Sequence, residues 1–142
     1  MTSAGTPWPN PLMMKYPLVT QEEEWGCGVA CVASVLGCKY DKARTYFPAA
    51  IRNHAKYKGF SGLQLSRALL RGGKRYAKRA KHYKRGPLEP GTIVSLSKTK
   101  GKYKGSGHYL VTTTGKQFMD PLGPKATYRP KPRNIQSYLP PL

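Results

Sequence analysis

The sequence predicts an α+β domain in which N-terminal helices pack on a C-terminal antiparallel sheet. Three observations lead to this fold class. Helical patterns with cap and stop signals occupy residues 27–73, segments rich in β-branched residues occupy 92–120, and the two kinds of segment do not alternate. Separate runs of helices and strands are typical of α+β domains, whereas alternation would indicate a parallel sheet.

The first predicted helix, 27–36, is small and apolar on nearly every side, as expected of a core helix, and Gly37 ends it. Two short helical segments follow at 41–47 and 48–56. The first opens with an aspartate that can cap it, and the second with a proline, which suits a first helical position. A further helix begins after Ser61, carries an apolar face toward the first helix, and stops at paired glycines (Leu63, Leu65, Leu69 and Leu70; Gly72 and Gly73).

The strand signals come later in the chain. Residues 92–97 are rich in β-branched side chains and follow a Pro-Gly turn. Residues 108–114 and 117–120 flank the pair 115–116, which contains a glycine, and together they predict a tight β-hairpin. We therefore expect an antiparallel sheet against the helical half.

The chain of 142 residues has the length of one domain. Residues 1–20 are rich in Pro and small residues and predict an extended arm that is laid over the surface or left mobile. Residues 21–142 are expected to form a single domain. The tail, 130–142, receives no assigned role, and the oligomeric state stays open.

The chain is strongly basic, with 25 Lys and Arg against 6 Asp and Glu and a formal net charge of +19. Much of the excess lies in residues 74–85 and 98–104. Such a surface attracts polyanions such as nucleic acid, or an acidic partner, but it is also compatible with a solvated face that keeps the protein soluble. An RNA-binding role would require aromatic platforms or a fitted groove as well.

The cysteines and the N-terminus bear on the compartment. Three cysteines within residues 27–38 do not resemble a disulfide framework and favour a reducing environment. Residues 1–18 contain four prolines and no uninterrupted apolar segment, so no secretory signal is expected, and no stretch reaches the ~20 apolar residues of a membrane span. A cytoplasmic protein is expected, with delivery as an effector the alternative.

Cys27 is the candidate nucleophile. It stands between Gly26 and Gly28 where the apolar helix begins, and the positive end of a helix dipole and its free N–H groups favour a thiolate. The two glycines are expected to let a substrate backbone approach closely. Cys31, on the buried body of the helix, is expected to be an inert small hydrophobic residue.

His108 is the candidate base. It opens an apolar strand directly after a glycine-rich loop, where a side chain can stand at the rim of a cleft. His54 and His82 lie in basic segments and are expected to be exposed surface residues. Asp120 closes the neighbouring strand, twelve positions after His108, so it can orient the imidazole, although it can also simply end the strand and form a turn.

Two further features precede the nucleophile. Gln21 lies on the loop that leads to the helix and can donate its side-chain amide to an oxyanion. Residues 22–24 are three glutamates, half of the acidic residues of the chain, and are either a solvated loop or a negative rim for a basic partner. A zinc site at Cys27, Cys31 and Cys38 is disfavoured because the spacing along an apolar helix is unusual for zinc, and no metal or other cofactor is expected.

Three blocks together resemble a known family: Gln21-x5-Cys27-Gly28-x-Ala30-Cys31, then Gly107-His108-Tyr109-x-Val111, then Asp120-Pro121-x-Gly123. They are similar to the C39 peptidases, which are papain-like domains that cut leader peptides after a Gly-Gly pair, and to their stand-alone relatives. The resemblance implies a papain-like cysteine peptidase fold. It also implies that Cys27 is the nucleophile, His108 the general base and then acid, Asp120 the orienting residue and Gln21 the oxyanion-hole donor.

The function expected from the sequence is therefore that of a cysteine peptidase. It would cleave a peptide or isopeptide bond of a peptide or protein substrate through an acyl-enzyme, although the same residues could carry out transfer or deamidation. The alternative is a toxin, effector or binding protein of the same fold that acts on RNA or another polyanion through its basic surface.

Overall fold

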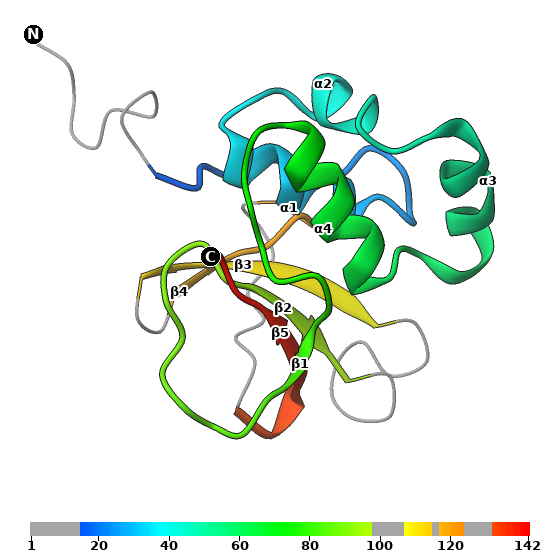
Figure 1. Cartoon of the computed structure of the whole chain (residues 1–142). Coiled ribbons are helices and arrows are strands. Elements are labelled where there is room, and N and C mark those ends of the chain that lie inside the picture. The colour runs from blue at the N-terminus through cyan, green and yellow to red at the C-terminus, as the bar shows by residue number, and fades with distance from the viewer. Residues whose placement is uncertain (1–14, 98–106, 115–116, 124–131) are drawn as a thin grey trace, which may run out of the picture.

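The computed structural model describes residues 15–97, 107–114, 117–123 and 132–142. It is an α+β fold in which four helices precede a five-stranded antiparallel sheet. Figure 1 shows the helices gathered on one side of the sheet. This order of elements confirms the predicted α+β class. Three predicted features lie wholly or partly outside the described residues: the first part of the arm, the basic loop 98–104 and the hairpin turn 115–116.

The central helix α1 (Cys27–Leu36) forms as predicted. Eight of its residues, Gly28 to Val35, are buried, which agrees with an apolar helix that neighbours surround. Gly37 ends the helix with φ +69°, a left-handed conformation that glycine adopts without steric cost. The helix that carries the candidate nucleophile is thus at the centre of the core.

Helices α2 (Tyr40–Arg44) and α3 (Ala49–Lys58) differ slightly from the prediction. The N-cap of α2 is Lys39, so Asp41 lies in the first turn and does not cap the helix. Pro48 is the N-cap of α3 and not its first helical residue. Helix α2 begins one residue earlier than predicted, at Tyr40, whose side chain is 5% exposed and packs in the core, and it ends at Arg44 and not at residue 47.

Helix α4 (Gly62–Arg71) begins with the predicted Ser61 cap. The Ser61 hydroxyl accepts from the Gln64 backbone N–H at 3.2 Å, and the Gln64 side chain accepts from the Ser61 N–H at 2.9 Å. This reciprocal capping box satisfies two N–H groups at the helix start. Leu65 and Leu69 are fully buried, as predicted, whereas Leu63 is only partly buried and Leu70 is 59% exposed. The predicted apolar face is therefore confirmed for Leu65 and Leu69 and wrong for Leu70.

The sheet contains β1 (Lys81–His82), β2 (Ile93–Leu96), β3 (His108–Thr114), β4 (Gln117–Met119) and β5 (Ile135–Leu139). Its strand order is β1-β5-β2-β3-β4, and every pair is antiparallel. The predicted hairpin of β3 and β4 is present. Strand β5 was not predicted, and it follows a 3₁₀ turn, Pro132–Asn134, to lie between β1 and β2.

The two faces of the sheet belong to different hydrophobic clusters. The larger cluster joins the helices to side chains of one face, including Ile93, Val111 and Leu139. The smaller one, on the other face, consists of Val94, Leu96, Leu110 and Ile135, with partly buried aromatic and leucine side chains packed against it. Alternate residues of one strand point to opposite faces, which explains why neighbours such as Ile93 and Val94 belong to different clusters.

The last residues of the arm are part of the core. Tyr16 is 8% exposed, and its hydroxyl occupies the space where a Cβ on Gly91 would stand, at 2.5 Å. The Ser34 hydroxyl of α1 donates to the Pro17 carbonyl at 2.6 Å. Residues 15–20 are therefore fixed against α1 and the start of β2. In the described part of the chain, no helix combines the length and the apolar character that a membrane crossing requires.

Candidate functional site

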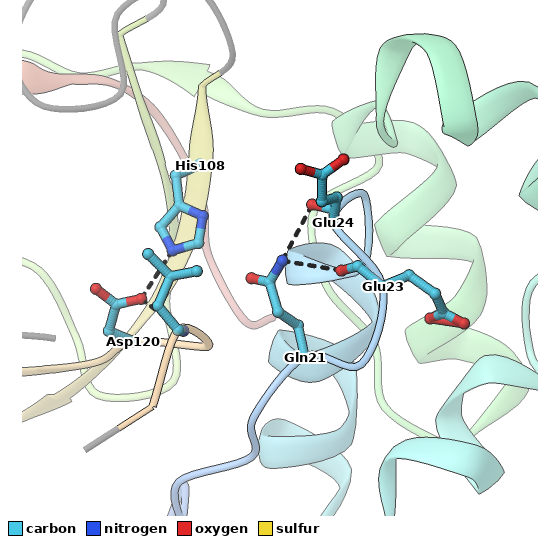
Figure 2. A network of polar contacts seen from close by, with 6 residues as sticks. Gln21, Glu23, Glu24, His108 and Asp120 are labelled. Atoms are coloured by element: carbon cyan, nitrogen blue, oxygen red, sulfur yellow. Dashed lines mark hydrogen bonds and ion pairs between the residues drawn. The ribbon is translucent and has the colours of Figure 1, made fainter. Parts of the chain in front are cut away.

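The site is built around a buried pair, His108 and Asp120. His108 opens β3, and Asp120 follows the last residue of β4 on the neighbouring strand. The hairpin brings His108 Nε2 within 2.8 Å of Asp120 Oδ1 (Figure 2). The same carboxylate oxygen accepts the Leu122 backbone N–H at 2.9 Å. Asp120 therefore has both roles considered from the sequence, since it ends the strand with a turn and holds the imidazole.

The electrostatic surroundings favour the imidazolium form of His108. Burial by itself lowers the pKa of His108, but hydrogen bonds to Asp120 and Cys27 and the negative charges of both partners outweigh it and raise this pKa to about 9. Asp120 contacts Nε2 of the ring, and Cys27 acts on the same imidazole. The histidine thus bridges a carboxylate and a thiol.

Cys27 is the first residue of α1 and is partly exposed. Among the described residues, no side chain caps this end of the helix, because its N-cap is Gly26. The first N–H groups of a helix lack intrahelical acceptors and carry the positive end of the dipole. An anion that forms next to Cys27 would meet these N–H groups.

Gln21 lies beside the site, but its amide hydrogens are already used. Its Nε2 donates to the carbonyl oxygens of Glu23 at 2.9 Å and Glu24 at 3.0 Å (Figure 2). Its Oε1 is buried without a hydrogen-bond partner among the described residues, and Figure 2 shows it on the side of His108 and Asp120. For Gln21 to donate to an oxyanion, the amide must rotate and release one of these carbonyls. Its role as a donor stays a prediction.

The loop before Cys27 is held at several points. Glu23 accepts a hydrogen bond from the Tyr40 hydroxyl and forms an ion pair with Arg44, with 3.1 Å between Oε2 and Nε. Burial and the hydrogen bond to Glu23 raise the pKa of Tyr40, which keeps it a donor. The Gln21 backbone N–H donates to the Pro121 carbonyl at 2.8 Å, which ties this loop to the turn after Asp120. Of the three glutamates, Glu23 is thus a structural residue.

The glycines around Cys27 serve packing within the protein. A Cβ on Gly26 would lie 2.0 Å from the Tyr40 hydroxyl, and one on Gly28 would lie 2.8 Å from Leu65 Cδ2. Both values are far below ordinary van der Waals contact. Side chains of α2 and α4 thus occupy the Cβ positions of Gly26 and Gly28, so packing within the protein requires both glycines. The expected approach of a substrate backbone stays a prediction.

The other cysteines and histidines lie elsewhere. Cys31 is fully buried, as expected, and burial raises the pKa of its thiol well above the ordinary value. Burial also raises the pKa of Cys38. His54 and His82 are exposed, as expected. Within the described ranges, no three His, Cys, Asp or Glu side chains are grouped as metal ligands would be.

Sequence reasoning missed one positioning residue next to His108. The Tyr109 hydroxyl donates to the Phe60 carbonyl, which joins β3 to the segment before α4. The Phe60 ring in turn contacts the ring of Trp25 edge to face, with 5.8 Å between the ring centroids. Trp25 lies two positions before Cys27 in the sequence. Tyr109 was visible in the Gly-His-Tyr block, but its partner is 49 positions away in the sequence.

No protein-family model matches this chain, and a search of curated proteins finds no match. The resemblance to C39 peptidases therefore depends on the three sequence blocks alone.

Proposed function

We propose that this chain is a papain-like cysteine hydrolase that cleaves a peptide or isopeptide bond. The observation that carries the proposal is the buried His108–Asp120 pair, whose histidine has the helix-start thiol of Cys27 as its other partner. A nucleophile, a base and a residue that orients the base are the groups that acyl transfer requires. The motif resemblance to C39 peptidases supports the same conclusion.

The chemistry would begin with the ion pair of a Cys27 thiolate and a His108 imidazolium. The sulfur attacks the amide carbonyl carbon, and the C–N bond breaks as His108 donates its proton to the leaving amine. The product of this step is a thioester on Cys27. The neutral imidazole then takes a proton from water, whose oxygen attacks the thioester and releases the acid, and the thiolate is regenerated. Asp120 keeps the ring oriented throughout.

The oxyanion of each tetrahedral intermediate would lie at the uncapped start of α1. Backbone N–H groups at that end, including that of Cys27, supply hydrogen bonds and the positive helix dipole. Gln21 supplies a second donor if its amide turns away from the Glu23 and Glu24 carbonyls. Removal of one oxyanion donor typically lowers kcat by about 10²–10³-fold. Gln21→Ala is expected to lower kcat within that range and to leave alkylation of Cys27 intact.

Two measurements test the proposal. Labelling of the folded protein with iodoacetamide should modify Cys27 first, and His108→Ala should slow that labelling while the exposed-histidine control His54→Ala should not. Unreactive Cys27, or labelling that is indifferent to His108→Ala, would contradict the proposal. Incubation with a peptide library in H₂¹⁸O should then produce new carboxyl groups that carry ¹⁸O, and Cys27→Ala should abolish them while Cys38→Ala retains them.

A further inference from the structure

A second candidate site lies at the other edge of the sheet. A pocket of about 430 Å³ opens between β1, the segment that follows it, and β5, and its lining includes Lys81, Tyr83, Lys84, Leu88 and Tyr138. This volume is in the range of small-ligand sites, roughly 300–1,000 Å³. Strand β1 is one edge of the sheet and β4 the opposite edge, so β2 and β3 separate the pocket from the strand that leads to Asp120 (Figure 1).

Two aromatic rings form one part of this pocket. Tyr83 and Tyr138 are both partly exposed, and their rings meet edge to face, with 6.1 Å between centroids and 80° between planes. An edge-on pair leaves at least one ring face uncovered by the partner ring. Tyr138 is paired with Lys81 across β1 and β5, and cross-strand partners share a face of the sheet, so a cation stands next to the ring.

Positive charge surrounds these rings. Lys81 and Lys84 line the pocket and are exposed, and none of its lining residues, all in the described part of the chain, is acidic. Residues 81–84 of the pocket lining are part of the basic run 74–85, in which every Lys and Arg is exposed. A concave site with flat rings, exposed cations and no lining carboxylate is complementary to a polyanion that carries planar groups.

We propose that this pocket binds single-stranded nucleic acid, with a base stacked on Tyr138 and the backbone phosphates against Lys81 and Lys84. Bases of a single strand are free to stack on aromatic side chains, while lysines neutralise the phosphates. An acidic peptide would use the lysines but has no reason to need the tyrosine rings. The inference does not depend on the proposed hydrolase activity, because none of the candidate catalytic residues lines the pocket.

Fluorescence anisotropy of a labelled oligouridylate of about 12 nucleotides, with the full chain, tests the proposal. Tyr138→Leu is expected to weaken binding about tenfold, because stacking of one base is lost, whereas Tyr138→Phe retains the ring and should bind within about twofold of the original chain. Lys81→Gln with Lys84→Gln should reduce the slope of log K against log salt by about 1.4, the value for two lost phosphate contacts.

Matched controls separate the pocket from the general charge of the protein. Tyr57 on α3 is 88% exposed, and Lys42 and Lys56 are exposed cations on α2 and α3. Tyr57→Leu should leave affinity unchanged, and Lys42→Gln with Lys56→Gln should have a clearly smaller effect than the pocket pair. Equal effects of the two lysine pairs, or equal affinity for a polyglutamate peptide of the same length, would overturn the proposal. If Tyr138→Leu lowers the melting temperature, its weaker binding no longer reports on stacking alone. The salt slope of the Lys81→Gln, Lys84→Gln variant, whose side chains are exposed, then tests the proposal.

Discussion

Replacement of Asp120 by Asn tests the electrostatic basis of the candidate site. The side-chain oxygen of Asn can still accept the Leu122 N–H and still contact the imidazole, so the turn is retained. What is lost is the negative charge beside His108. Because burial alone lowers the pKa of His108, the histidine of this variant should become a weaker base.

The size of the effect follows from the raised pKa. His108 moves from an ordinary value of 6.5 to about 9, and one pKa unit corresponds to about 1.36 kcal/mol. The site therefore favours the imidazolium by about 3 kcal/mol. The hydrogen bond to Asp120 is the largest of the favourable contributions. We expect Asp120→Asn to lower the pKa of His108 by at least about one unit.

NMR titration of the histidine ring protons measures this pKa directly, and loss of a signal in His108→Gln assigns it. Cys27→Ala serves as the comparison, because it removes the other partner of His108 and leaves the carboxylate in place; it should also lower the pKa of His108. A pKa of His108 that changes by less than about 0.3 unit in Asp120→Asn would refute the role given to the carboxylate.

Three further predictions concern stability. A raised pKa of His108 stabilises the fold fully below pH 6.5 and progressively less as pH rises to about 9, so the urea-derived free energy of unfolding should fall by about 3 kcal/mol over that interval. In Asp120→Asn this decrease should be smaller by at least about 1.4 kcal/mol, and an unchanged decrease would contradict the role of the carboxylate. Gly28→Ala places a Cβ 2.8 Å from Leu65 Cδ2 and should lower the free energy of unfolding, measured with urea, by about 1–3 kcal/mol. An unchanged free energy of unfolding would contradict the close packing of α1 against α4. A chain that ends at Asn134 lacks β5, the strand between β1 and β2, and should show no cooperative thermal transition. A cooperative transition in this shortened chain would show that the sheet does not need β5.

Elements with local signals were predicted well. Gly37 and the Ser61 capping box mark helix ends through groups within a few residues, and β3 has the bounds expected from its apolar run. Strand β5 was missed because its residues have a weak alternating pattern between prolines, and its place inside the sheet depends on pairing with β1 and β2. Pairing partners so distant in sequence leave no local signal.

In the candidate site, too, local signals were predicted well and contacts between distant segments were not. Cys27 at a helix start, His108 at a strand start and Asp120 at the end of the next strand are all readable from local pattern, and one hairpin suffices to join the latter two. The position of the loop before Cys27 could not be predicted, because it depends on Tyr40 and Arg44 of another helix. The orientation of Gln21 depends on the carbonyls of that loop, which only the folded backbone places.

The sequence by itself determined the α+β class, the core helix and the three residue types that acyl transfer needs, because caps, periodicity and hairpin spacing act over a few residues. Only the tertiary structure decided which segments, distant in the sequence, pack against one another. It showed that Gly26 and Gly28 make room for neighbouring helices, that the tail supplies an inner strand, and that part of the basic run lines one pocket with Tyr138. Each of these depends on contacts between residues far apart in the chain, which packing of the whole core determines.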